Sequence, residues 1–318
     1  MKSTNKTLAL SIIVTAALAA CGGGGGGDTT PLKVTPAPVS LSTIVTSVPA
    51  ATYAAGSDER AAYDLLNAER SKCGFGLLAQ DARLDAAAAA HANYQLLNNE
   101  TGHVETQGFP GFSGARPFER ANAKSYNGTN VGEVIAYESS GVASLRTLFT
   151  GPYHLTGLAT DTLDVGISFK STQLSQAVRD SLTIDFGNQP SKSNQTAEPG
   201  SVSTYPCSGV EGLRKSFTEN PNWAAASGTG AGGTPIYLVA SNKEKLVISG
   251  ASITPVGGGI VPVQVLTASN DPQKLLSAHQ ALVIPPSSLA ANTSYRVQVN
   301  GTVDGAVFSK DFTFKTGS

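Results

Sequence analysis

The sequence predicts an α+β protein in two successive parts: helices combined with strands, then a small β-sandwich. In the first part, apolar residues recur at helical spacing in two long segments, and two short apolar runs follow. In the second part, beginning near Thr234, short alternating runs follow one another as in a β-sandwich. Only 14% of the residues are charged, while 34 are Gly and 17 are Pro. This composition is typical of a loop-rich extracellular protein rather than a cytosolic enzyme.

The N-terminus has the pattern of an export signal. Lys2 and Lys6 precede the apolar stretch 8–17, which is too short to span a bilayer. The stretch ends in Leu18-Ala19-Ala20-Cys21, which is similar to a lipobox. We therefore expect residues 1–20 to be removed as a signal peptide and Cys21 to carry the lipid. The alternative is an ordinary secretory signal followed by a chance cysteine.

Residues 21–52 are predicted to be a tether to the membrane. Six glycines follow Cys21, and a run rich in Thr, Pro and Ser comes next; neither composition can bury a core. No Asp follows Cys21 directly, and similarity to enteric lipoproteins then implies sorting to the outer membrane.

Two cysteines remain after Cys21, namely Cys73 and Cys207. An even remainder outside the cytosol indicates one disulfide. The alternative is two buried free thiols.

Four helices are predicted. Residues 58–71 carry apolar side chains at helical spacing and follow Ser57, a suitable N-cap. Residues 81–98 include an alanine run with high helix propensity. A short helix is expected over 117–123, and a fourth over 142–149, ending before Pro152.

The remaining elements are strands. Residues 131–137 fit a strand or a short helix, and 164–169 and 181–186 are predicted strands. Residues 196–233, rich in Ser, Pro, Gly and Asn, form a predicted connector between a domain at 53–195 and an Ig-like β-sandwich at 234–318. The last two runs meet at Asp304-Gly305, a strong hairpin signal. The strands expected in the sandwich are 236–240, 245–253, 261–267, 281–284, 295–299 and 307–315.

Nucleic acid is excluded as a partner on charge. The chain has 22 Lys and Arg against 23 Asp and Glu. A nucleic-acid binder needs a basic excess, because contacts with phosphate supply most of its affinity.

A series of short motifs lies between residues 67 and 187. In order they are Asn67-Ala68-Glu69-Arg70, Gly102-His103, Gly132-Glu133-Val134-Ile135-Ala136, Tyr153-His154, Val165-Gly166-Ile167 and Asp185-Phe186-Gly187. Their order resembles the bacterial SCP-like branch of the CAP superfamily, kin to cysteine-rich secretory proteins and plant pathogenesis-related proteins. The resemblance covers residues 58–190. It implies an α-β-α sandwich with His103, Glu133 and His154 lining a central cavity.

The sequence departs from the family pattern at two places. Val134 stands where the family has Asn, and the segment 144–149 lacks the second cavity glutamate that many members carry. Glu105, two residues after His103, is the candidate for the missing carboxylate.

These residues leave three functions open. The favoured one is binding of a small apolar, glycan or peptide ligand in the cavity, with a divalent metal such as Zn²⁺ on His103 and His154. The second is a metal-assisted hydrolase with Glu133 as general base. The third is a structural or adhesive envelope protein in which these side chains only hold the fold. Histidines elsewhere are expected to be structural, with His91 in the core and His279 solvated, and Trp223 is expected to pack between the domains.

Overall fold

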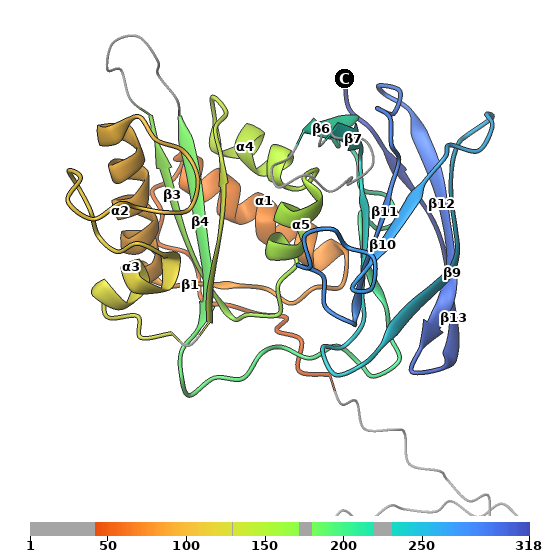
Figure 1. Ribbon diagram of the computed structural model, residues 1–318, viewed down its shortest axis with the longest axis horizontal. Helices are drawn as coiled ribbons and strands as arrows, with labels where there is room; N and C mark the ends of the chain where they lie inside the picture. The colour runs from red at the N-terminus through yellow and green to blue at the C-terminus, as the bar shows by residue number, and fades with distance from the viewer. Residues whose placement is uncertain (1–41, 129, 172–179, 219–230) are drawn as a thin grey trace, which may run out of the picture. The chain divides into compact units, whose positions relative to one another are not determined.

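The structure, a computed structural model, describes residues 42–128, 130–171, 180–218 and 231–318 (Figure 1). The predicted signal peptide, Cys21 and Trp223 lie outside the described residues. Residues Ser40–Ser318 form one compact unit. The boundaries proposed inside it, at 195 and 234, stay predictions. None of the helices in the described ranges has the length and apolar character needed to cross a membrane.

The four predicted helices are present, each within a residue or so of its expected ends. They are α1 (Asp58–Lys72), α2 (Ala82–Asn98), α3 (Pro117–Ala123) and α4 (Gly141–Leu148). Ser57 caps α1 by accepting a hydrogen bond from the Arg60 amide, and Asp81 caps α2 through the Arg83 amide. These caps satisfy backbone donors that no helix can satisfy internally.

A fifth helix, α5 (Pro152–Leu158), was not predicted. Pro152 was interpreted as a stop signal for the preceding helix. It also occupies the first turn of a new helix, where its missing N–H costs nothing and its fixed φ is favourable. This short helix carries His154.

The first sheet has the strand order β1-β3-β4-β2. It contains β1 (Ala79–Gln80), β2 (Asn130–Ala136), β3 (Asp164–Lys170) and β4 (Ser181–Asn188). The segment at 131–137 is thus a strand and not a short helix. β4 lies in the middle, paired antiparallel with both β2 and β3.

Helices cover both faces of this sheet (Figure 1). α2 packs on one face so closely that a Cβ on Gly166 of β3 would lie 2.1 Å from the backbone of Leu84. On the other face, α5 packs against β2, where a Cβ on Gly157 would lie 2.9 Å from the Val134 side chain. The α-β-α sandwich implied by the family resemblance is confirmed.

The second part consists of two antiparallel sheets, ordered β10-β11-β8-β5 and β13-β12-β9. This confirms the predicted β-sandwich. Asp304 and Gly305 both have positive φ, as a two-residue hairpin turn between β12 and β13 requires. The strands are β5 (Ser203–Tyr205), β6 (Ser216–Thr218), β7 (Ala231–Gly233), β8 (Ile236–Val239), β9 (Leu246–Pro255), β10 (Gln264–Thr267), β11 (Gln280–Ile284), β12 (Ser294–Val303) and β13 (Ala306–Lys315).

The predicted connector contains structure of its own. β5 joins the β10-β11-β8 sheet by pairing with β8, and β6 pairs with β7. Its Cys207 forms the expected disulfide with Cys73, at the end of α1, across a sequence separation of 134 residues. Buried apolar residues from both parts belong to a single hydrophobic cluster.

Candidate functional site

Two adjoining cavities are lined by both His103 and His154. The first, of about 430 Å³, is also lined by Glu133 and is called here the Glu133 cavity. The second, of about 670 Å³, is lined by Glu138 and Arg214 and is called the Arg214 cavity. The structure therefore brings His103, Glu133 and His154 to one cavity from three separate elements: the loop after α2, strand β2 and helix α5.

Both carboxylate oxygens of Glu133 have a hydrogen-bond partner. Its Oε1 lies 2.9 Å from Nδ1 of His103, and its Oε2 lies 2.7 Å from Nη2 of Arg120. Its side chain is only 1% exposed, whereas that of His103 is 45% exposed. Burial alone would raise the pKa of Glu133. The hydrogen bond from His103 and the nearby His91 and Arg120 outweigh burial and hold its pKa below the usual range.

Arg120, on α3, binds both Glu133 and the loop that carries His103. Its side chain is fully buried, and Nη1 donates to the carbonyls of His103 and Gly114 at 3.2 and 3.3 Å. One guanidinium thus fixes both the Glu133 carboxylate and the backbone that carries His103. The sequence analysis missed this residue, because Arg120 stands between Glu119 and Asn122 in a polar stretch, where no local signal marks it as buried.

Glu105 does not line either cavity. It is buried, and Oε1 lies 2.9 Å from Nδ1 of His91, while Oε2 accepts from the Ser113 amide at 2.6 Å. The other ring nitrogen of His91 lies 2.8 Å from the Gly102 carbonyl. Glu105 and His91 therefore fasten the loop that bears His103 onto α2.

A second buried carboxyl lies directly opposite Glu133. Asp185 of β4 pairs with Glu133 in the β2–β4 register, so both side chains leave the same face of the sheet. Asp185 is fully buried. Among the described residues, no donor forms a hydrogen bond to either of its carboxyl oxygens. Burial and the adjacent Glu133 raise the pKa of Asp185 well above its usual range. Two such carboxyls cannot both ionise in a dry site, so Asp185 holds the proton.

This proton makes stability depend on pH. Folded Asp185 keeps a proton that the unfolded chain releases above about pH 4, so its contribution shrinks as the pH rises toward the folded pKa. The lowered pKa of Glu133 acts in the opposite sense, but only below about pH 4.3, where unfolded glutamate titrates. In wild type, the free energy of unfolding should therefore decrease by up to about 1.4 kcal/mol per pH unit as the pH rises, and Asp185→Asn should abolish this decrease.

Urea denaturation of wild type and Asp185→Asn at pH 5, 6 and 7 measures this effect. Asp64→Asn, which changes a carboxylate on the exposed side of α1, is the matched control and should follow wild type. Parallel stability curves for wild type and Asp185→Asn would show that Asp185 is ionised in the folded protein.

Glu138 is a further carboxylate beside the two histidines. It lines the Arg214 cavity with both histidines, and its Oε1 accepts from Arg214 Nη1 at 2.6 Å and from Thr147 Oγ1 at 2.8 Å. Glu138 follows the last residue of β2 by two positions, outside every motif considered above, so only the tertiary structure brings it to the cavity.

The geometry does not supply the three protein ligands expected for zinc. Among the described residues, no group of three or more His, Cys, Asp or Glu side chains is placed to hold a metal ion. Glu133 is committed to His103 and Arg120, and Glu138 to Arg214 and Thr147. The nitrogen donors that line a shared cavity are those of His103 and His154.

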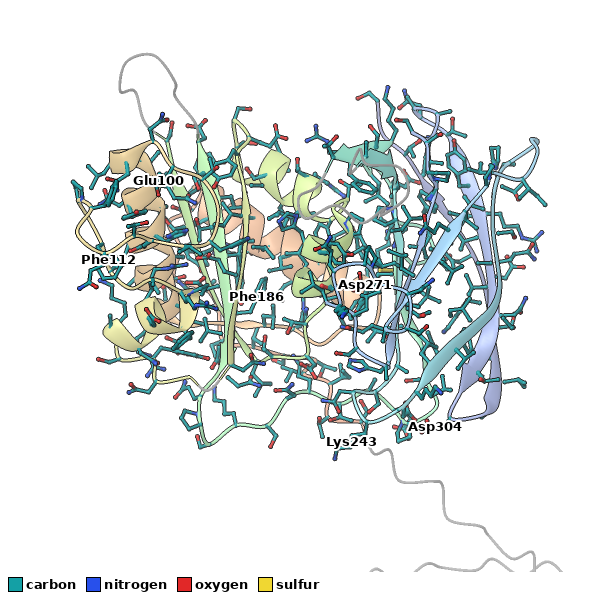
Figure 2. The ribbon with its side chains drawn as sticks, viewed as in Figure 1. Glu100, Phe112, Phe186, Lys243, Asp271 and Asp304 are labelled. Carbon is teal, nitrogen blue, oxygen red and sulfur yellow. A yellow bond between two sulfur atoms is a disulfide. The ribbon has the colours of Figure 1, made fainter. Side chains whose placement is uncertain are left out.

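The C-terminal part contributes to the wall of the Glu133 cavity. Tyr153, next to His154, donates its hydroxyl to Asp271 at 2.5 Å. Figure 2 shows Asp271 between α5 and the strands of the C-terminal part. The same carboxylate accepts from the amides of Gln273, Leu275 and Leu276, and Leu275 lines the cavity.

His279 is a correction to the sequence analysis. It is half-buried, not solvated, and lines a third cavity of about 340 Å³ with Arg70 and Asp161. Burial lowers the pKa of His279. Its position at the end of a loop, before β11, could not reveal this packing.

Comparison with known proteins finds one family and several solved structures similar to part of the chain. Residues 63–177 match the model of the cysteine-rich secretory protein family, CAP. Among solved structures, an extracellular SCP-domain protein from Bacillus anthracis is 22% identical, with a TM-score of 0.36, over 41% of this chain and 40% of that chain. An outer surface protein of Borrelia burgdorferi is 20% identical, with a TM-score of 0.37, over 42% of this chain and 92% of that chain. This chain therefore spans well under two thirds of the length of the Bacillus protein. No curated protein matched the chain.

Proposed function

The chain carries a CAP domain, and from this premise we propose that it is an exported envelope lipoprotein that binds a ligand between His103 and His154 without converting it. One observation carries the proposal. Glu133, which lines the same cavity as the two histidines, is fixed by His103 and Arg120 in a cavity that is otherwise open. A concave cavity with a few fixed polar groups is the usual form of a ligand-binding site.

Hydrolysis with Glu133 as general base is less well supported. A general base works best when its pKa lies near the operating pH. The pKa of Glu133 is instead held below the usual range by His103, His91 and Arg120, and its side chain is almost fully buried. The lowered pKa makes Glu133 a weaker proton acceptor, and burial limits the access of a substrate or water to it.

A divalent metal is the second candidate, because His103 and His154 line the same cavities. A bound Zn²⁺ would act as a Lewis acid or as a bridge to the ligand. His103 uses Nδ1 for Glu133, so its Nε2 is the nitrogen available to a metal. With two protein donors and no third, such a site would be weaker than a structural zinc site.

Calorimetric titration with zinc tests the shared site. Both His103→Ala and His154→Ala should weaken zinc binding at least tenfold, and wild-type affinity should fall as the pH is lowered, because protons compete with zinc for the ligand nitrogens. His279→Ala, a half-buried histidine of a different cavity, is the matched control. Equal affinity in all four proteins would show that the two histidines do not form one metal-binding site.

We further propose that Cys21 anchors the protein in the outer membrane through its lipid. Cys21→Ser should move the protein from the membrane fraction to the soluble fraction, because the acyl chains provide the anchoring free energy. Unchanged fractionation of the Cys21→Ser protein with membranes would contradict the lipobox interpretation.

A further inference from the structure

The two histidine-lined cavities follow one edge of the first sheet. β2 is an end strand: it pairs with β4 on one side and, in the described ranges, with no strand on the other. The Glu133 cavity is lined by Gly132, Glu133 and Val134, and the Arg214 cavity by Ile135 and Ala136. Successive residues of a strand point to opposite faces. A cavity that touches successive residues therefore passes along the strand edge and not over a single face.

The walls on either side of this edge carry the two histidines. Glu133 and its partner His103 lie on the face covered by α2 and α3, whereas Val134 packs against α5, the helix that carries His154. We call the two cavities together the β2 groove. Since His103 and His154 line both, the two cavities adjoin along the strand.

The edge of β2 lacks the devices that usually protect an end strand. It contains no proline and no lysine, and its one charged residue, Glu133, is turned aside into the ion pair with Arg120. The opposite end strand, β1, is only two residues long and is protected by its shortness. Of the two edges, only that of β2 is long enough to accept another strand.

We infer that the β2 groove binds an extended peptide segment of another protein, which adds to the sheet as a strand beside β2. This inference rests on the proposed function and names its ligand class. An extended peptide presents N–H and C=O groups at the spacing of a neighbouring strand, so its main chain can satisfy the free backbone groups of the edge. Residues 134–136 of β2 are buried, so the accessible part of the edge, residues 130–133, spans about 13 Å and accepts about four peptide residues.

The side-chain walls would then select the sequence. Alternate peptide side chains would face the His103 wall and the α5 wall, where Leu275 and Tyr153 also lie. The carboxylates lining the groove, Glu133 and Glu138, are already paired with Arg120 and Arg214. Among the described residues, the groove therefore has no unpaired carboxylate to attract a basic peptide, and it favours a neutral segment.

The first test is selection from a phage-displayed library of random decapeptides on the purified chain, followed by calorimetry with a synthetic copy of the selected peptide. Gly132→Val should weaken binding at least tenfold, because a side chain there enters the Glu133 cavity without meeting any atom within 4 Å of its Cβ. Gly250→Val is the matched control, since Gly250 is also a strand glycine with open space around its Cβ. It should bind as wild type does.

The second test is N-methylation of the peptide at one position at a time. A peptide paired along a strand edge points every second N–H toward that strand. Methylation should therefore abolish binding at alternate positions and be tolerated at those between. Uniform tolerance, or loss without alternation, would overturn strand addition.

The remaining outcomes separate this inference from the proposed function. If zinc binds through His103 and His154 but no peptide is selected, the peptide inference is wrong and the proposed function stands. If neither zinc, peptide nor oligosaccharide binds, both fail. If a panel of soluble oligosaccharides binds wild type and Gly250→Val but not Gly132→Val, the groove is a glycan site and the peptide inference is wrong.

Discussion

Replacing both Cys73 and Cys207 with alanine is expected to lower the free energy of unfolding by about 5 kcal/mol, with a fall of roughly 10–20 °C in Tm. The reason is chain entropy. The disulfide joins residues separated by 134 positions, and without it the unfolded chain regains the conformations that this long closed loop excludes. The effect should be large because the disulfide ties the end of α1 to a segment that leads into the second part.

Denaturation of the double variant, and of wild type with and without a reducing agent, measures this loss. Reduced wild type should behave like the double variant, while neither thiol should be alkylated in the non-reduced native protein. A midpoint that does not change on reduction would contradict the prediction.

Replacing Arg120 with methionine is expected to cost about 3–5 kcal/mol, the range for breaking a buried ion pair by removing one partner. Arg120 is fully buried and neutralises Glu133, which is 1% exposed. Its loss leaves a carboxylate in the interior with no full positive charge beside it, next to the carboxyl of Asp185. The pKa of Glu133 should rise as a result, since Arg120 is one of the groups that lower it.

A double variant separates the charge effect from lost packing. Glu133→Gln should restore part of the stability of Arg120→Met, because the uncompensated charge is then absent. Arg296→Met is the matched control: Arg296 forms an exposed ion pair with Asp311, and its loss should change stability far less. Urea denaturation at pH 7 measures the free energy of unfolding of wild type, Arg120→Met, the double variant and Arg296→Met. Equal losses for Arg120→Met and Arg296→Met would show that the buried pair is not structurally important.

The Arg120→Met substitution affects the site as well as the stability of the protein. Arg120 also fixes the His103 carbonyl, so zinc binding should weaken in Arg120→Met even under conditions where the protein is fully folded. The site therefore depends on a residue that does not line either histidine cavity.

Local signals in the sequence were sufficient for most of the elements. Ser57 marks the start of α1, because a side-chain oxygen satisfies one of the first free amides of a helix. Asp304-Gly305 marks the last hairpin, because its turn requires two residues with positive φ. Each of these signals lies within a few residues of the structure it specifies.

Local signals failed where one residue is compatible with two structures. Pro152 can stop one helix or begin another, and the packing of α5 against β2 decided for a new helix. β5 is three residues long and is a strand only because β8 lies beside it.

What the sequence by itself determined is the order of most elements and the pairing of Cys73 with Cys207, and it singled out His103, Glu133 and His154 as candidates for one cavity. What only the tertiary structure decided is how these residues are held. Asp185 acts on Glu133 because the β2–β4 register sets them opposite each other, and Glu105 serves His91 instead of the cavity. Arg120 and Glu138 belong to the site for the same reason. Hydrogen bonds and buried charges act over a few ångströms in space, and residues far apart in the chain become neighbours only when the sheet and its helices have packed.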